Sequence, residues 1–107
     1  MSRLTTPRAV GTNTNTKATL LLRERTVLGD AFVELVIWQL PRVLPGSDHR
    51  YKYRLALIQQ GECVVRYDNE AGKGDHRHIG RRETPYRFVD LETLIHDFRA
   101  AVTEHLK

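Results

Sequence analysis

The chain has 107 residues, of which 40% are hydrophobic and 28% are charged, values typical of a single soluble globular domain. No apolar run approaches the roughly 20 residues that a membrane-spanning helix needs, and no secretory signal is visible, so we expect a cytoplasmic protein. The single cysteine excludes an internal disulfide and a multi-cysteine zinc site. The net charge of +4 favours an anionic partner, such as nucleic acid or an acidic protein.

Two regions of the chain differ in composition. Residues 1–16 include a polar tract of threonine and asparagine, which predicts a disordered tail with nothing to bury. From Lys17 onward, apolar residues recur in patterns typical of strands and of a helix. We therefore expect residues 17–107 to form one domain.

Four strands are expected in the first part of this domain. Residues 18–28 are rich in Leu, Thr and Val, and a Gly-Asp turn follows them. Residues 31–40 are apolar on both faces, which predicts a strand that is central in the sheet or covered on both sides. A loop containing Pro and Gly leads to residues 51–58, where apolar and polar side chains alternate, and a fourth strand is expected at 63–68.

The third and fourth strands form a hairpin whose register follows from its two faces. A three-residue loop at 60–62 aligns the apolar faces and places Leu57 opposite Val65, whereas a slip of one residue would exchange core and solvent. The register places Cys63 on the apolar face, as an inert core thiol. The polar face then carries Lys52, Arg54, Arg66 and Asp68.

A glycine-rich loop at 70–75 precedes a short strand that begins at His76. Ile79 is expected to face the core, so His76 and His78 should point to the polar face. Residues 81–85 are interpreted as a polar connection.

The last element predicted is a helix at 91–106. Asp90 is suited to be its N-cap, and apolar residues recur at helical spacing to form one stripe. The apolar face of the sheet is the partner available for this stripe. The sequence therefore predicts an α+β fold, an antiparallel sheet of about five strands with the C-terminal helix packed across one face.

The strongest chemical signal is the pair of histidines that share one face of a strand. Imidazole titrates near neutral pH, so this pair suits general acid and base catalysis of RNA phosphodiester cleavage, which requires no metal or cofactor. Lys73 lies between two glycines that allow close approach to a phosphate, and Asp68 would orient Arg54 or a histidine. The candidate catalytic residues are His76, His78, Lys73 and Asp68. The candidate nucleic-acid-binding residues are Lys52, Arg54, Arg66, Arg77, Arg81 and Arg82.

Other interpretations of the same residues stay open. The histidine pair can be two solvated side chains, or it can bind a metal ion together with Asp68 or Asp75. The glycines around Lys73 can form a phosphate cradle or simply a turn between strands. Aromatic side chains for stacking on RNA bases are few on the polar face, where Tyr86 is the best candidate for exposure.

Three segments of the chain are distinctive in combination. They are residues 21–34 (LLRERTVLGDAFVE), residues 53–57 (YRLAL) and residues 66–78 (RYDNEAGKGDHRH), the last followed by PYRF at 85–88. From about residue 17 to the C-terminus, the sequence resembles the TumE-type toxin family of bacterial toxin–antitoxin modules. The resemblance implies a toxin whose partner is a cognate antitoxin of the helix-turn-helix type. By analogy with other small basic toxins, it also favours RNA as the substrate.

These observations lead to one main hypothesis and two alternatives. The main hypothesis is a metal-independent endoribonuclease toxin that acts on cellular RNA. The first alternative is a non-catalytic binding module whose basic face docks an acidic antitoxin or a nucleic acid. The second is a metal-dependent hydrolase that uses the histidine pair and an aspartate.

Overall fold

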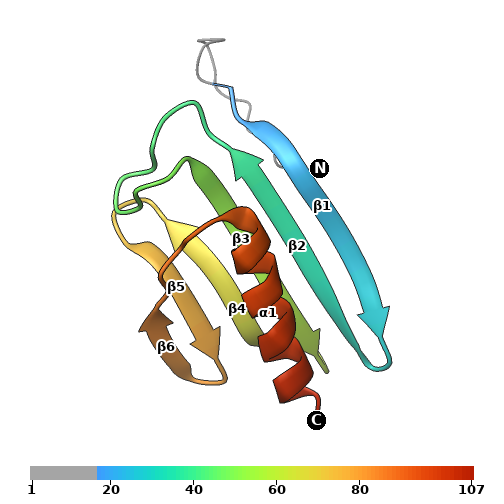
Figure 1. Ribbon diagram of the computed structural model, residues 1–107. Helices are drawn as coiled ribbons and strands as arrows, with labels where there is room; N and C mark the ends of the chain where they lie inside the picture. The colour runs from blue at the N-terminus through green and yellow to red at the C-terminus, as the bar shows by residue number, and fades with distance from the viewer. Residues whose placement is uncertain (1–16) are drawn as a thin grey trace.

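The computed structural model describes residues 17–107, which form an antiparallel sheet of six strands with a helix against one face (Figure 1). The tail predicted for residues 1–16 lies outside the described residues. The strands follow one another in chain order, so every pairing joins neighbours in the sequence. The predicted α+β class is confirmed. The elements are β1 (Thr19–Leu28), β2 (Ala31–Gln39), β3 (Tyr51–Gln59), β4 (Glu62–Glu70), β5 (Gly74–Ile79), β6 (Arg82–Pro85) and α1 (Leu91–His105).

Helix α1 begins where the sequence predicts. The Asp90 carboxylate accepts a hydrogen bond of 2.7 Å from the backbone N–H of Thr93, which satisfies one of the free donors at the helix start. The same hydrogen bond holds the pKa of Asp90 below its ordinary value. Within residues 17–107, no helix is long and apolar enough to cross a membrane.

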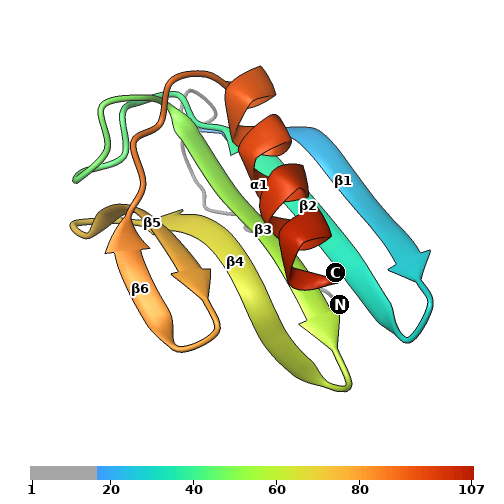
Figure 2. The ribbon, with the colours of Figure 1, turned by 60° about the horizontal axis from the view of Figure 1, so that its bottom comes forward.

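The core lies between α1 and the centre of the sheet. Figure 2 shows the helix lying against one face of the sheet. The helix contacts β3 and β4, whose alternating apolar residues point to this face. Burial of this face is the main source of stability, because each fully buried large side chain contributes about 1.5–3 kcal/mol. The buried cluster consists of Ala31, Val33, Leu35, Ile37, Tyr53, Leu55, Leu57, Val65, Tyr67, Leu94, Phe98 and Val102.

Strand β2 is central, as its apolar sequence predicts. It pairs with β1 on one edge and with β3 on the other. Alternate residues from Ala31 to Ile37 are buried on the helix side, whereas the residues between them are half-buried on the opposite face. The half-buried side chains come from a face that α1 does not cover.

The β3–β4 hairpin has the predicted register but a different turn. Leu57 lies opposite Val65 as expected, yet the turn has two residues, Gln60 and Gly61, with φ values of 52° and 79°. The register is kept by a bulge, because β4 carries one extra residue between the partners of Leu57 and Ile58. Cys63 therefore leaves the core face and is exposed, so the expectation of an inert core thiol is wrong.

The segment predicted as a polar connection is partly a strand. Residues 82–85 form β6, which pairs antiparallel with β5 and raises the number of strands to six. Gly80, with a φ of 61°, occupies the intervening tight turn. Because β6 is short and polar, its sequence lacks the apolar alternation by which strands are usually recognised.

Tyr86 is not the exposed aromatic residue that the sequence indicates. Its ring contacts Tyr67 edge-on, with 5.1 Å between centroids, and its hydroxyl donates a hydrogen bond of 2.7 Å to Asp97. Burial, followed by this hydrogen bond, raises the pKa of Tyr86. Tyr86 thus fastens the segment before α1 to the core and is not free to stack on RNA.

The core makes a direct prediction about stability. Phe98 has no exposed surface and contacts Tyr67 edge-on, so Phe98→Ala should lower the free energy of unfolding by about 3–5 kcal/mol. Urea denaturation followed by circular dichroism measures the change. Val89→Ala is the matched control, because Val89 is 62% exposed and its loss should cost less than about 0.5 kcal/mol. Equal effects of the two substitutions would contradict this core.

Candidate functional site

The face of the sheet opposite α1 gathers polar side chains from three neighbouring strands. On β4, Arg66 and Asp68 alternate with buried residues and point away from the helix. Antiparallel pairing places Arg66 beside His78 and Asp68 beside His76 of β5. On the other side of β5, His78 lies beside Glu83 of β6. The regular alternation of three strands therefore builds this cluster, which we call the histidine face.

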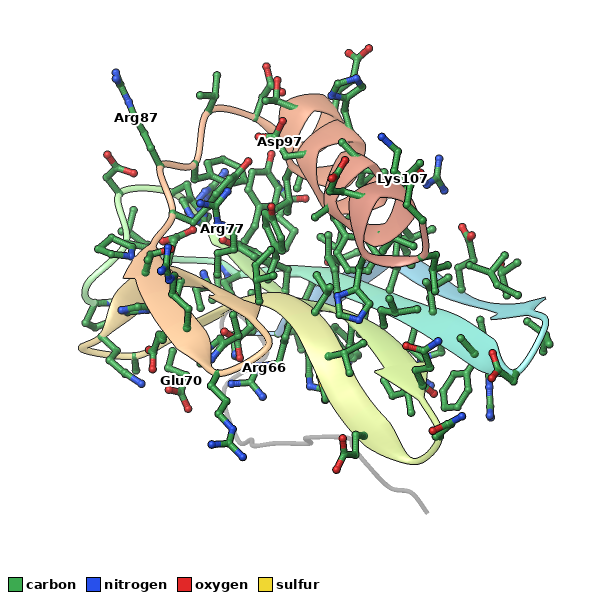
Figure 3. The ribbon with its side chains drawn as sticks, turned by 90° about the horizontal axis from the view of Figure 1, so that it is seen from below. Arg66, Glu70, Arg77, Arg87, Asp97 and Lys107 are labelled. Atoms are coloured by element: carbon green, nitrogen blue, oxygen red, sulfur yellow. The ribbon has the colours of Figure 1, made fainter. Side chains whose placement is uncertain are left out.

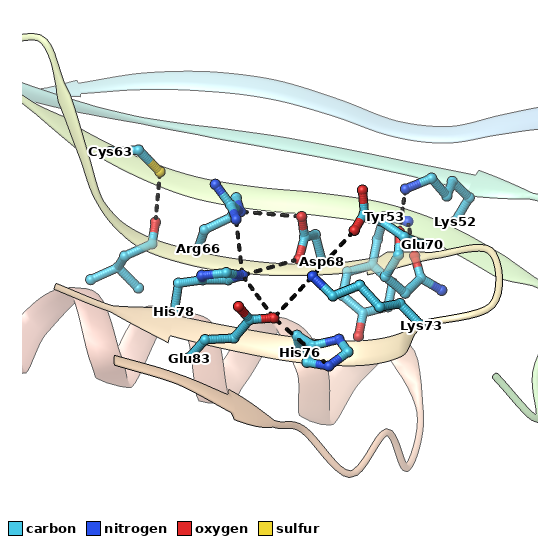
Figure 4. A network of polar contacts seen from close by, with 12 residues as sticks. Lys52, Tyr53, Cys63, Arg66, Asp68, Glu70, Lys73, His76, His78 and Glu83 are labelled. Carbon is cyan, nitrogen blue, oxygen red and sulfur yellow. Dashed lines mark hydrogen bonds and ion pairs between the residues drawn. The ribbon is translucent and has the colours of Figure 1, made fainter. Parts of the chain in front are cut away.

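The carboxylate of Glu83 lies at the centre of the histidine face (Figure 4). Its Oε2 atom is 3.2 Å from Nζ of Lys73 and 3.8 Å from Nε2 of both His76 and His78. Two imidazoles and an ammonium group thus converge on one oxygen atom. A single anionic group of similar size can contact all three.

The contact with Arg66 defines the state of His78. Nη2 of Arg66 lies 2.9 Å from Nε2 of His78, and a guanidinium group can only donate hydrogen bonds. His78 Nε2 therefore accepts, and the ring is neutral with its proton on Nδ1. The carboxylates of Asp68 and Glu83 lie farther from Nε2, at 3.9 Å and 3.8 Å, so the shorter Arg66 contact decides the tautomer.

Arg66 is itself positioned by Asp68. The distance from Arg66 Nε to Asp68 Oδ2 is 3.1 Å, which makes an ion pair, although the N–H is not aligned for a hydrogen bond. Both side chains are largely buried, so solvent screens this pair less than a surface ion pair. Asp68 therefore orients Arg66, whereas the sequence suggested that it would orient Arg54 or a histidine.

His76 has a different hydrogen-bonding pattern. Its Nδ1 is 3.1 Å from the carbonyl oxygen of Gly74, which can only accept, so Nδ1 carries a proton. Its Nε2 is the atom that faces Glu83, at 3.8 Å from Oε2. The two histidines thus present the same atom, Nε2, to one point, but each ring is oriented by a different partner.

Charge on the histidine face is balanced within the cluster. A hydrogen bond from Lys73 holds the pKa of Glu83 below its ordinary value, and the same bond raises the pKa of Lys73. Glu83 therefore remains a carboxylate in mildly acidic solution. Both groups are substantially exposed, so an external anion can compete with Glu83 for Lys73.

Five of the predicted site residues come together on the histidine face, and two more lie beside it. Arg54 of β3 is opposite Asp68 and exposed. The ammonium group of Lys52 donates a hydrogen bond to the carbonyl oxygen of Asn69. The five residues that meet directly are Arg66, Asp68, Lys73, His76 and His78.

Three predicted nucleic-acid-binding arginines are placed elsewhere. Arg77 alternates with the histidines and therefore points to the helix side of β5, away from Arg66 (Figure 3). Arg82 pairs with Ile79 and shares that side, and Arg81 lies in the turn between β5 and β6. The three arginines are thus divided between the helix side of the sheet and a turn.

Sequence reasoning missed Glu83, which is the centre of the cluster. The omission follows from treating residues 81–85 as a connection. The signal was Gly80, since a two-residue turn at positions 80 and 81 places Glu83 opposite His78.

A second polar cluster, on the helix face, was also missed. The carboxylate of Asp75 accepts hydrogen bonds of 2.6 Å from the Tyr53 hydroxyl and 2.5 Å from the Ser47 hydroxyl. Its Oδ2 is 2.7 Å from Nε2 of His49. Because His49 Nδ1 accepts the backbone N–H of Tyr51, the proton of the neutral His49 ring is on Nε2 and is donated to Asp75.

The Asp75 cluster is closed and fully bonded. Phe88 stacks on the His49 ring with 3.9 Å between centroids, and the side chains of His49 and Asp75 are 8% and 7% exposed. Beside it, buried Asn69 bonds the backbone of Tyr53 and of Tyr51. The cluster fastens the loop before β3 to the start of β5, and it offers a substrate no access.

The position of Asp75 also bears on the metal alternative. Asp75 faces α1, whereas His76 and His78 face the other way, so Asp75 cannot complete a site with them. Within residues 17–107, no group of three or more His, Cys, Asp or Glu side chains is arranged to hold a metal ion.

Comparison with known proteins identifies the family. A protein-family model described as "Toxin TumE" matches residues 4–106, nearly the whole chain. The chain belongs to the TumE toxin family. Membership in the TumE family confirms the expected class of protein and implies a cognate antitoxin as its partner. Searches of curated proteins and of solved structures give no match.

The Asp75 cluster makes a prediction with a defined pH dependence. Tyr53→Phe removes one donor to Asp75 and should lower the free energy of unfolding by about 1–3 kcal/mol near pH 7, as measured by urea denaturation. Tyr51→Phe is the control, because its hydroxyl makes no hydrogen bond within residues 17–107 and its loss should cost little.

The cost of Tyr53→Phe should shrink in alkali. Burial and then Asp75 raise the pKa of Tyr53 above the ordinary value of 10.0, so the unfolded chain loses this proton first. The stabilisation is complete below about pH 9 and falls above about pH 10, by about 1.4 kcal/mol per pH unit. A difference between wild type and Tyr53→Phe that stays constant up to pH 11 would contradict a buried neutral Tyr53.

Proposed function

We propose that this TumE family member is a metal-independent endoribonuclease and that the histidine face is its active site. The observation that carries the proposal is the convergence of Lys73, His76 and His78 on one oxygen of Glu83. A phosphate of RNA can take the place of the Glu83 carboxylate and contact the same three groups. Glu83 is 37% exposed, which leaves room for its side chain to rotate away.

The proposed reaction is an attack by the ribose 2′-hydroxyl on the adjacent phosphate. His78, neutral at Nε2, removes the proton from the 2′-oxygen, which forms a bond to phosphorus. The bond from phosphorus to the 5′-oxygen breaks, and protonated His76 delivers a proton from Nε2 to that leaving oxygen. The products are a 2′,3′-cyclic phosphate and a free 5′-hydroxyl, so one proton is taken up and one is released.

Arg66 links binding of RNA to the state of His78. Its Nη2 occupies the lone pair of His78 in the free protein, where His78 cannot act as a base. A phosphate oxygen is a stronger acceptor for a guanidinium group than a neutral imidazole is. Bound RNA would thus draw Arg66 to the phosphate and free His78 Nε2, while Lys73 stabilises the negative charge that develops.

The neighbouring basic residues suggest how RNA lies on the protein. Arg54 and Lys52 of β3 extend the histidine face toward the centre of the sheet. Arg81 lies at the turn beyond β5. We assign these three to flanking phosphates and leave Arg77 and Arg82, which face α1, outside the RNA path. The proposal includes an acidic antitoxin of the helix-turn-helix type and an action in the cytoplasm.

The histidine pair provides the decisive test. His76→Ala combined with His78→Ala should lower RNA cleavage by purified toxin by at least about 100-fold and abolish growth arrest on induced expression. The matched control replaces His96 and His105, two exposed histidines of α1, and should retain full activity. Cleavage is followed on radiolabelled RNA with a chelator present.

The same experiment separates the alternatives. If growth arrest survives replacement of both histidines but is lost when Arg54 and Arg66 are replaced, the toxin acts by charge-driven binding and not by catalysis. Activity that a chelator abolishes would indicate a metal-dependent hydrolase.

Glu83 gives a second prediction, on binding. Glu83→Gln keeps the size of the side chain but removes the charge that competes with phosphate, so the affinity for a 2′-deoxy oligonucleotide should rise about 3–10-fold. Fluorescence anisotropy at fixed salt measures it. Glu62→Gln, an exposed carboxylate in the β3–β4 turn region, is the control. Weaker binding by Glu83→Gln would show that the carboxylate supports the site and does not occupy it.

A further inference from the structure

The two edges of the sheet differ in how well they are protected. β6 is an edge strand of four residues and contains Pro85, features that discourage pairing with another chain. β1, at the other edge, has ten residues and no proline, and its one strand neighbour within residues 17–107 is β2. Its outer backbone N–H and C=O groups therefore form a long row open to another strand.

Apolar side chains are exposed along this free edge. Val27 is 70% exposed, and Leu20, Leu21 and Leu28 are each more than one-third exposed. α1 lies over β3 and β4 and leaves β1 outside the area it covers (Figure 1). Among residues 17–107, four of the seven exposed large apolar residues thus lie on one strand, where a partner strand would cover them.

The charges on β1 are divided between its faces. Arg23 and Arg25 pair with Val36 and Glu34 and point away from α1, and the guanidinium group of Arg25 lies 4.1 Å above the Phe32 ring. On the other face, Glu24 is already engaged, with its carboxylate 3.6 Å from Arg99 and bonded by Thr26. The free charge on β1 is therefore positive and lies on one face.

This arrangement disfavours a second copy of the chain as the partner. When two copies of a strand pair antiparallel about a twofold axis, opposing residues lie on the same face. In the central registers, Arg23 and Arg25 then oppose themselves or each other. Like charges in opposing positions destabilise a strand pair, whereas acidic residues there would stabilise it.

We infer that the β1 edge is the docking site for an extended segment of the antitoxin, which adds a seventh strand to the sheet. Main-chain hydrogen bonds supply affinity, and side chains at alternate positions supply specificity. The segment would carry acidic residues opposite Arg23 and Arg25 and apolar residues against Leu22 and Leu28. The inference rests on the antitoxin partnership of the proposed function and is independent of RNA cleavage.

Hydrogen exchange of the full-length toxin, alone and with its antitoxin, tests the site directly. Amides of residues 19–28 should exchange at least about tenfold more slowly in the complex, whereas those of β6 should change little. Protection confined to β4, β5 and β6 would overturn the inference, because the antitoxin would then cover the histidine face. Protection of β1 in toxin alone, with formation of a dimer, would overturn it in favour of a second copy.

Charge reversal tests the chemistry of the partner. Arg23→Glu with Arg25→Glu should weaken antitoxin binding by about tenfold or more, measured by calorimetry, while purified toxin keeps its RNA cleavage rate. The control reverses Arg42 and Arg87, two exposed arginines outside β1, and should leave affinity unchanged. Thermal unfolding confirms that both double variants fold. Equal antitoxin affinity of the β1 double variant and the control double variant would overturn the inference. If the wild-type toxin cleaves RNA no better than the histidine double variant, that result would contradict only the proposed function.

Discussion

The buried carboxylate of Asp75 sets the orientation of both histidine side chains on β5. Three neutral donors, from Ser47, His49 and Tyr53, surround it on the helix side of the sheet. A charge this deeply buried is tolerated because each oxygen is hydrogen-bonded, and it would be costly without those bonds. Since side chains alternate along a strand, Asp75 on the inside requires the histidines that follow to be on the outside. The histidine face is thus fixed by a network on the opposite side of the same strand.

Much of this arrangement could be predicted from the sequence, and the missing parts share a cause. The alternation of β3 and β4 gave the register that places Arg54 opposite Asp68, and Ile79 gave the direction of the histidines. The bulge in β4 could not be predicted from the alternation, because it arises from the turn. With a turn of only two residues, Gln60 and Gly61, one extra residue in β4 is needed to keep the register. The Asp75 cluster could not be predicted either, since two of its three donors, Ser47 and His49, lie 28 and 26 residues earlier in an irregular loop.

The histidine face and the β1 edge are separate in both position and physics. The first depends on hydrogen bonds that fix the proton positions of two imidazoles. The second depends on the two arginines of β1 and on its outer backbone, which pairs with no strand within residues 17–107. β2, β3 and β4 lie between β1 and the histidines of β5. If the proposed function and docking site are correct, an antitoxin bound at the edge must reach across the sheet, or alter its twist, to affect the histidine face. Substitutions that change partner recognition on β1 would then leave the histidine face unaltered.

The order of elements along the chain has a consequence for synthesis. Every strand pairs with its immediate predecessor, so the sheet can assemble hairpin by hairpin as it leaves the ribosome. α1, however, follows all six strands, and Tyr67, which lies between Arg66 and Asp68 on β4, is covered by Phe98 of that helix. Until α1 emerges, the central strands lack their apolar cover, and the strands that carry the histidine face lack this support. The histidine face is therefore completed only after α1 has been synthesised.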